Sequence, residues 1–267
     1  MSGGLALVSF AALLVLERRR PLRRPTRPKA RRDLRNLAVA ALSAATIRTC
    51  EAPLVKPLAG LVHRRRWGLL TRLSLPAWLE VGLGVVLLDY TLWVWHVLTH
   101  RAPPLWRLHQ VHHADLDMDA STALRFHFLE MLASVPWRAG QVLLVGAAPL
   151  TLSVWQTLTL VAILFHHSNV RLPLELERRL APLIMTPRLH GIHHSVRPEE
   201  RDSNWGTIFT WPDRLHGTAL ADLERPVTIG VESPRAPERL TFGQLLALPL
   251  SGNGSHPYPQ GSPSGVA

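Results

Sequence analysis

The histidines of this chain have the spacing of metal ligands on helices. His96 and His100 are four residues apart, so on a helix both imidazoles lie on one face. The pattern His-x-x-His-His occurs twice, and each copy places three imidazoles on one side of a helix. The two copies are His109, His112 and His113, and His190, His193 and His194. Eight of the 14 histidines thus form three clusters.

Metal binding is the chemistry that this pattern indicates. Eight imidazoles packed together without metal would be repelling cations or unsatisfied donors. One first-row ion accepts at most about six ligands, so two ions are implied. His127 and the pair His166 and His167 are additional candidates, whereas His63, His216 and His256 stand alone and are interpreted as surface or core residues.

The other residue types narrow the kind of metal site. Cys50 is the only cysteine, which excludes an intramolecular disulfide and a site with several thiolates. No Asp or Glu lies within the three motifs, and no His-Glu-x-x-His is present, which argues against hydrolytic two-metal sites and zinc proteases. Imidazole suits iron, copper, nickel and zinc alike, so ligand type alone leaves the metal open.

Composition favours a membrane protein. Hydrophobic residues make up 47% of the 267 residues and charged residues only 18%, and the apolar residues come in long blocks. The net charge of +11 comes mainly from arginines that flank these blocks, at 18–35, at 64–66 and around the histidine motifs. Such arginines are typical of cytoplasmic loops and of contacts with anionic lipid headgroups, so we expect a membrane partner and no nucleic acid.

Several apolar segments are expected to be membrane helices that position the histidines. Residues 5–16 precede a basic run and are interpreted as a retained membrane segment, and 77–98 is the strongest spanning candidate. Segment 37–62 is expected to be a hairpin or a tilted helix. Segments 128–148 and 151–165 should form a hairpin that turns near Pro149, because candidate ligands precede and follow this pair.

The predicted fold is therefore all-α, with an integral-membrane helical base and a cytoplasmic, histidine-rich helical cap. If 18–35 and 64–66 are both cytoplasmic, one of the segments 37–62 and 77–98 cannot cross the membrane fully. We expect N-terminal membrane segments and basic loops at 1–76, a catalytic domain at 77–220, and a C-terminal extension at 221–267. The Gly, Ser and Pro content from about 251 predicts a disordered tail.

Motifs at 89–130 and 167–218, read in order, resemble the fatty acid hydroxylase and sterol desaturase superfamily. The first stretch contains Trp95-His96, His100-Arg101, Leu105-Trp106-Arg107-Leu108-His109, His112-His113 and Arg125-Phe126-His127. The second contains His167-Ser168-Asn169, Thr186-Pro187-Arg188, His190, His193-His194-Ser195, Asp202, Asn204-Trp205-Gly206 and Asp213 to Thr218. The similarity covers about residues 80–220, and three positions depart from the pattern: Phe128, Trp205 and His216.

The resemblance implies a membrane oxidoreductase with two iron ions and molecular oxygen as co-substrate. It implies hydroxylation or desaturation of a lipid, such as a fatty acyl chain, a sphingolipid, a sterol or a carotenoid. Electrons would come from an external cytochrome- or ferredoxin-type donor. The implied ligands are the eight motif histidines together with His127 and His167, with His166 ranked below His167.

Four polar residues are candidates for bracing the ligands. Asp89 lies seven residues before His96 on the same helix face, where it can accept the distal N–H of a ligand imidazole or be an interfacial polar residue. Asn169, Asp202 and Asn204 match polar positions of the superfamily.

Two other classes of function fit the sequence less well. A non-catalytic membrane metal-binding or transport protein also uses intramembrane histidines, but its ligands should follow a permeation path, whereas two of the three clusters lie in polar segments. A lipid hydrolase or phosphatase would need a nucleophile motif, and the sequence contains none.

Overall fold

The computed structural model describes residues 2–221, 224, 226–232 and 240–251. In this part of the chain every named element is helical, and extended pairing is limited to isolated bridges such as Ser195 with Ile229. The expected all-α fold is confirmed. The predicted disordered tail from about 251 lies almost entirely outside the described residues.

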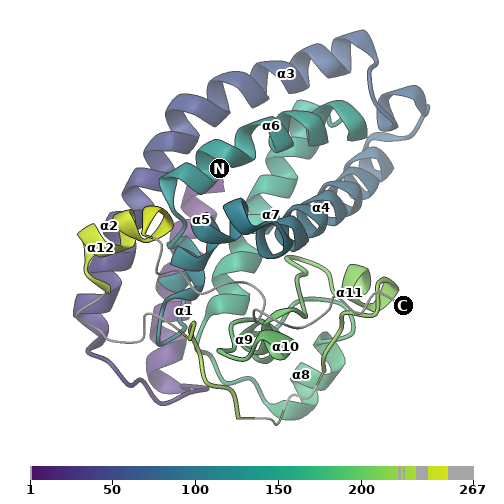
Figure 1. The fold of residues 1–267 in the computed structure, drawn as a ribbon. Coiled ribbons are helices and arrows are strands. Elements are labelled where there is room, and N and C mark those ends of the chain that lie inside the picture. Colours follow the sequence, from purple (N-terminus) through teal and green to yellow (C-terminus); the bar gives the residue numbers. More distant parts are fainter. Residues whose placement is uncertain (1, 222–223, 225, 233–239, 252–267) are drawn as a thin grey trace, which may run out of the picture.

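Helices α3 (Ala52–Arg65), α4 (Ala77–Arg101) and α6 (Phe128–Val145) form the upper part of the molecule in Figure 1. A continuous helical rod comprises α2 (Lys29–Thr46), a π-helical turn η1 (Ile47–Glu51) and α3 (Ala52–Arg65). The segment 37–62 is therefore one helix with a π-bulge and not a hairpin. The short element η2 (Leu70–Arg72) then leads into α4 (Ala77–Arg101).

The expected pair of helices after the second motif is present as α6 (Phe128–Val145) and α7 (Pro149–His167). Gly146 ends α6 in the left-handed conformation with φ 76°, and Pro149 begins α7 at a position where its missing N–H costs nothing. Both helices pack against α4, and the main core between them and α3 contains Leu88, Val142 and Trp155.

Short helices gather at the other end of the molecule, around the ends of α4 and α7 (Figure 1). These are α5 (Pro103–His113), η3 (Thr122–Leu124), α8 (Leu174–Leu180), α9 (Pro187–His193), α10 (Pro198–Arg201) and α11 (Trp211–Leu215). In α9, Thr186 accepts a hydrogen bond from the N–H of Leu189 and Pro187 occupies the first turn, which fixes where the third motif begins. The first helix α1 (Ser2–Arg19) packs against α7, and the last elements are α12 (Phe242–Ala247) and η5 (Leu248–Leu250).

Three helical segments are long and apolar enough to cross a membrane: Lys29–Arg72, Ala77–Arg101 and Pro149–His167. The second contains the expected span 77–98, and the third contains 151–165. Neither α1 nor α6 is among these candidates, although α1 exposes Leu7 and Val8, at 72% and 68%.

Candidate metal centre

Nine histidines lie in two groups. Each histidine offers one ring nitrogen, and within a group these nitrogens all lie within 4.8 Å of one another. The five-histidine group contains His96, His100, His109, His113 and His193. The four-histidine group contains His112, His167, His190 and His194. Each group has enough nitrogen ligands for one first-row metal ion, so the geometry offers two candidate sites.

The five-histidine group joins three helices. His96 and His100 come from the last two turns of α4, His109 and His113 from α5, and His193 from the end of α9. The ring of His193 lies 4.6 Å from that of His96, 4.7 Å from that of His100 and 4.8 Å from that of His113, measured between ring centroids. One residue of the third motif thus completes a group that the first two motifs begin.

The four-histidine group is centred on His167 at the end of α7. Its Nε2 lies 2.9 Å from Nε2 of His112, 3.1 Å from that of His190 and 3.2 Å from that of His194. Nitrogens at right angles around an ion, each about 2.1 Å from it, are separated by about 3 Å. The three nitrogens thus lie at about this spacing from that of His167, and one nitrogen of each of the four side chains lies within 4.8 Å of the others, as shared binding of one ion requires.

Each His-x-x-His-His motif is divided between the two groups, a division that the sequence did not predict. In the second motif His109 and His113 belong to the five-histidine group, and His112 belongs to the other. In the third motif His190 and His194 belong to the four-histidine group and His193 to the other. Side chains four residues apart lie on one face of a helix, whereas the third imidazole of each motif turns toward the neighbouring group.

Hydrogen bonds to Nδ1 orient three imidazoles of the five-histidine group. The Nδ1 of His109 lies 2.8 Å from Oε1 of Glu130, a side chain that is only 2% exposed. The backbone carbonyls of Trp205 and Ser203 lie 2.8 Å and 2.9 Å from Nδ1 of His96 and His193. A partner on one ring nitrogen sets the tautomer, so the other nitrogen faces the ion, as in many metal sites.

Burial keeps the imidazoles in the neutral form that metal binding requires. His112, His113, His190, His193 and His194 are at most 2% exposed. Burial first, and neighbouring imidazoles next, hold the pKa of each of them well below its usual value. Nε2 of His193 has no hydrogen-bond partner among the described residues, and neither nitrogen of His113 has one. Buried nitrogens without partners are costly unless a metal ion binds them, so these residues fit a metal.

A buried ion network connects the second motif to the basic N-terminal segment. Asp115, two residues after His113, lies 3.0 Å from Nη1 of Arg32 and 3.4 Å from Nη1 of Arg125, and accepts a hydrogen bond from Asn36. Burial alone would raise the pKa of Asp115, but Arg32 and Arg125 hold it down to about 2. Nε of Arg125 also donates to the carbonyl of Val111, within α5. The network thereby anchors the helix that carries three of the nine histidines.

Residues 81–218 match the fatty acid hydroxylase family, a stretch that includes all nine grouped histidines. The chain belongs to the fatty acid hydroxylase family. This confirms the resemblance drawn from the motifs. The chain is 33% identical over 147 residues to an ornithine lipid hydroxylase of Rhizobium tropici, covering 54% of this chain and 42% of that protein.

Other relatives also bear names of lipid oxygenases. The chain is 30% identical over 178 residues to the human alkylglycerol monooxygenase, covering 64% of this chain and 37% of that protein. It is 30% identical over 142 residues to a cholesterol 25-hydroxylase-like protein of Danio rerio, covering 52% of this chain and 55% of that protein. The chain thus spans about a third to a half of the length of these relatives. No solved structure matches it.

His127 lies outside both histidine groups of this fatty acid hydroxylase family member. Its Nδ1 accepts a hydrogen bond from the N–H of Leu129 at the start of α6, and its Nε2 lies 3.3 Å from the carbonyl of Leu246. His166 also lies outside the groups, although its ring is 4.0 Å from that of His190. Its Nδ1 lies 3.1 Å from the carbonyl of Thr207.

Three of the four polar candidates, Asp89, Asn169 and Asn204, hold backbone segments, and in the described part of the chain none of the four lies at hydrogen-bond distance from a grouped histidine. Asp89 accepts from the N–H groups of Ile208 and Phe209, at 3.2 Å and 3.1 Å. Asn204 joins Leu189 in α9 to Leu220. Asn169 exchanges two hydrogen bonds with the backbone of Arg23. Asp202 comes nearest, with an oxygen 3.9 Å from Nδ1 of His100.

The sequence reasoning missed Glu130, the one carboxylate that bonds a grouped histidine at hydrogen-bond distance among the described residues. It included Asp213 among the motif residues but gave it no role; this side chain receives hydrogen bonds from the indole of Trp93 and from the backbone of Trp205 and Gly206. The signal for Glu130 was present, because an acidic residue at the start of an apolar helix is a functional candidate. Its distance of 21 residues from His109 concealed the pairing.

Proposed function

We propose that this protein is a di-iron oxygenase that hydroxylates a membrane lipid. The convergence of nine histidines, eight of them buried, into two adjacent groups carries the proposal. The names of the relatives favour hydroxylation over desaturation. We take the family match and the position of all nine histidines as support for residues 77–220 as the catalytic unit.

Iron is the metal that best fits the ligand set together with the family. The five- and four-histidine groups use neutral imidazoles and no thiolate, which leaves iron, copper, nickel and zinc open. We favour iron among these because the relatives bear oxygenase names and the motifs resemble those of di-iron enzymes. When bound, the two ions supply the electrons and the electrophile needed to activate O₂.

The overall reaction needs two electrons from outside the grouped residues. Insertion of one oxygen atom converts C–H to C–OH, and the second oxygen atom leaves as water with two protons and two electrons. No cytochrome- or ferredoxin-like motif is present in the sequence, so we propose an external carrier of that type.

This chain's own residues hold the reacting groups and exclude water. Glu130 keeps His109 in one tautomer, and the carbonyl of Trp205 does the same for His96. Trp106 is 1% exposed, and its ring lies 5.0 Å from that of His100, so the five-histidine group is shielded from solvent on this side. Burial of this kind protects a reactive centre from side reactions with water.

We propose that the lipid reaches the site from the bilayer and that the histidine groups face the cytoplasm. The groups lie at the ends of two candidate spans, Ala77–Arg101 and Pro149–His167. Arginines are concentrated at 18–35, beside this end of the molecule, and arginine-rich segments favour the cytoplasmic side.

The direct experiment uses full-length protein purified in detergent and loaded with iron under reducing conditions. The proposal predicts O₂ consumption that depends on a reductant and lipid extract, with a lipid product heavier by one oxygen atom. Labelled O₂ should transfer its label to the product. A protein that binds two ions but consumes no O₂ and changes no lipid would support a metal-binding or transport role and would contradict the proposal.

A further inference from the structure

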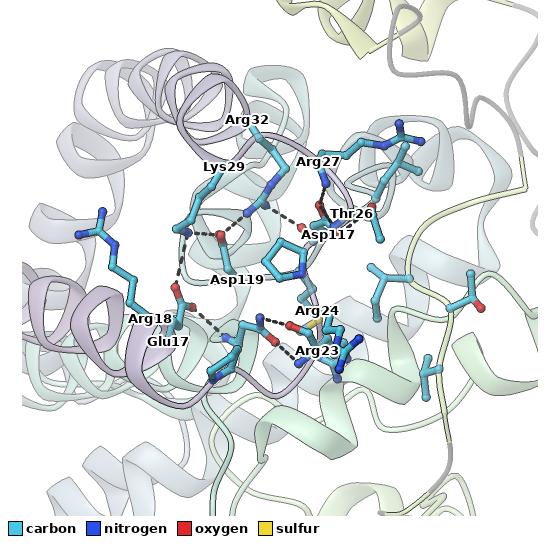
Figure 2. A pocket seen from close by; sticks show the side chains of 18 residues that line it. Glu17, Arg18, Arg23, Arg24, Thr26, Arg27, Lys29, Arg32, Asp117 and Asp119 are labelled. Atoms are coloured by element: carbon cyan, nitrogen blue, oxygen red, sulfur yellow. Dashed lines mark hydrogen bonds and ion pairs between the residues drawn. The ribbon is translucent and has the colours of Figure 1, made fainter.

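A basic cavity of about 500 Å³ lies beside the metal centre, where the end of α1 meets the segment 21–32 (Figure 2). Residues 116–119, Asn169 and residues 227–229 complete its wall. Six of its side chains are basic and three are acidic. Nothing in the proposed oxygenase chemistry uses this cavity.

The three acidic side chains have their own partners in the wall. Oε1 of Glu17 accepts hydrogen bonds of 2.8 Å from the N–H groups of Ala120 and Asn169. Both oxygens of Asp117 accept from the backbone of Thr26, at 2.9 Å and 3.1 Å. Asp119 pairs with Lys29 and Arg32, as the dashed lines of Figure 2 show. Lys29 and Arg32 are therefore neutralised locally.

Arg23 is held in place without a carboxylate partner among the described residues. Asn169 fixes its backbone with two hydrogen bonds of 2.8 Å, and its Nη2 donates to the carbonyl of Pro187 at 3.0 Å. Its Nη1 is buried and has no hydrogen-bond partner in this part of the chain. Burial first, and repulsion from Arg188 next, lower the pKa of Arg23 to about 10, although attraction to Glu177 partly offsets them, so Arg23 remains a cation at neutral pH.

Two further arginines supply positive charge that the fold does not neutralise. The side chains of Arg24 and Arg27 line the cavity and are exposed, and neither forms an ion pair with a described carboxylate. Figure 2 shows Arg23 and Arg24 on the side of the cavity opposite the Lys29, Arg32 and Asp119 cluster. The cavity thus combines an ordered, buried donor with adaptable cations, an arrangement suited to a phosphate group.

Exposed apolar side chains lie on α1, in the turns before Glu17 and the exposed Arg18 that line the cavity. Val15 and Leu16 on α1 are 47% and 43% exposed, and the next residue, Glu17, lines the cavity. Leu7 and Val8, further along α1, are more exposed still. An acyl chain can lie along this helix while its polar end enters the cavity, which a free anion cannot do. This favours an amphiphile as the ligand.

We propose that this cavity binds the phosphate group of an anionic membrane phospholipid, with Arg23 and Arg24 as the principal ligands and Arg27 closing over it. The site is separate from the metal centre but is mechanically connected to it. Arg23 contacts Gly191, which lies between His190 and His193 in α9, and a Cβ at this glycine would overlap the guanidinium. Filling the cavity should therefore hold α9 and its histidines more firmly.

The test measures binding of dihexanoyl phosphatidylglycerol to the full-length, delipidated protein in detergent, by calorimetry and by thermal unfolding. Phosphatidylcholine of the same chain length and inorganic phosphate serve as the comparison ligands. We expect phosphatidylglycerol to raise the Tm and to bind more tightly than the other two. Arg24→Gln and Arg27→Gln should each weaken its binding by up to about tenfold, the effect of losing one charge-assisted hydrogen bond.

Arg65→Gln is the matched control, because it removes the same charge from an exposed site outside the cavity and should bind as wild type does. Arg23→Gln tests the buried donor. If the Arg23→Gln protein unfolds, the variants Arg24→Gln and Arg27→Gln, at exposed positions, still decide the test. Equal binding by wild type and both exposed variants would overturn the proposal. Inorganic phosphate binding as tightly as the lipid would show a free-anion site and overturn the lipid assignment. Both results are binding measurements, so neither depends on the proposed oxygenase activity.

Discussion

The two histidine groups are held in different ways. In the five-histidine group, Glu130 and the carbonyls of Trp205 and Ser203 bond three of the five Nδ1 atoms. In the four-histidine group only His167 has such a bond, to the carbonyl of Ile163 at 2.9 Å. Nδ1 of His112, His190 and His194 has no partner among the described residues. The first group is therefore oriented mainly by hydrogen bonds and the second mainly by packing.

Ring contacts supply the packing around the four-histidine group. His112 stacks on Phe126 with ring centroids 4.4 Å apart and planes at 8°, and His194 stacks on His113 at 4.2 Å and 13°. A hydrogen-bonded carboxylate makes an imidazole a more basic ligand, whereas a stacked ring restricts only its orientation. We infer that the two ions would differ in ligand strength, and that each group responds to a different kind of substitution.

The largest effect should come from the residue at the centre of the four-histidine group. His167→Ala removes the imidazole that three others approach, so that group should lose its ion and lipid turnover should fall by at least about hundredfold, beyond the loss seen for residues that only orient ligands. Metal counting by native mass spectrometry and turnover assays measure this. His63→Ala, at an exposed isolated histidine, is the control. A His167→Ala protein with full metal content would show that His167 is not a ligand of the four-histidine group.

Glu130→Gln should weaken the five-histidine group alone. The amide keeps the shape of the side chain but cannot stabilise charge on His109, so metal affinity of that group should fall by about ten- to hundredfold. Chelator competition followed by native mass spectrometry separates the one-ion from the two-ion protein. Glu199→Gln, at an exposed site of the same end of the molecule, should have no effect. Equal weakening of metal binding in both groups would contradict the claim that hydrogen bonds orient mainly the five-histidine group.

Phe126→Ala is the matching test of the packed group. Loss of the ring stacked on His112 should weaken metal binding there by about two- to tenfold, as expected for an aromatic pair worth about 0.5–1.5 kcal/mol. The five-histidine group should keep its affinity in the same competition assay. Phe126→Tyr retains the stacking ring and should behave as wild type, and a loss of similar size in that variant would show that stacking is not the cause.

The smallest effect should be that of His127→Ala, a residue that the resemblance assigns as a ligand and the geometry places apart. Its Nδ1 caps α6, so the variant should lose about 1 kcal/mol of unfolding free energy and keep both ions. Thermal unfolding and metal analysis report the two quantities separately. Loss of an ion with unchanged stability would instead make His127 a ligand.

Local spacing made much of the fold and of the site predictable. The apolar blocks indicated the spans within Ala77–Arg101 and Pro149–His167, and the break at Ala148-Pro149 indicated the turn between α6 and α7. The i, i+4 spacing also identified His96 and His100 as partners, because it depends only on helix geometry. The expectation that all three imidazoles of each His-x-x-His-His motif act together was too simple, since His112 and His193 belong to the other group.

The sequence did not predict the contacts between residues that are far apart in the chain. Assigning His112 and His193 to their groups requires knowing how α5, α7 and α9 meet. The pairing of Glu130 with His109, and the bonds of Asp89 to the backbone at 208 and 209, depend on the tertiary fold in the same way. The histidine pattern did not reveal the basic cavity either, since its wall combines residues near 20, 117, 169 and 228.

The central claim is that nine histidines form two adjacent metal sites. Crystals of the iron-loaded protein, measured at wavelengths on either side of the iron absorption edge, test it most directly. The account predicts two anomalous peaks per chain, one among His96, His100, His109, His113 and His193 and one among His112, His167, His190 and His194. A single peak, or a peak bonded to His127, would contradict it.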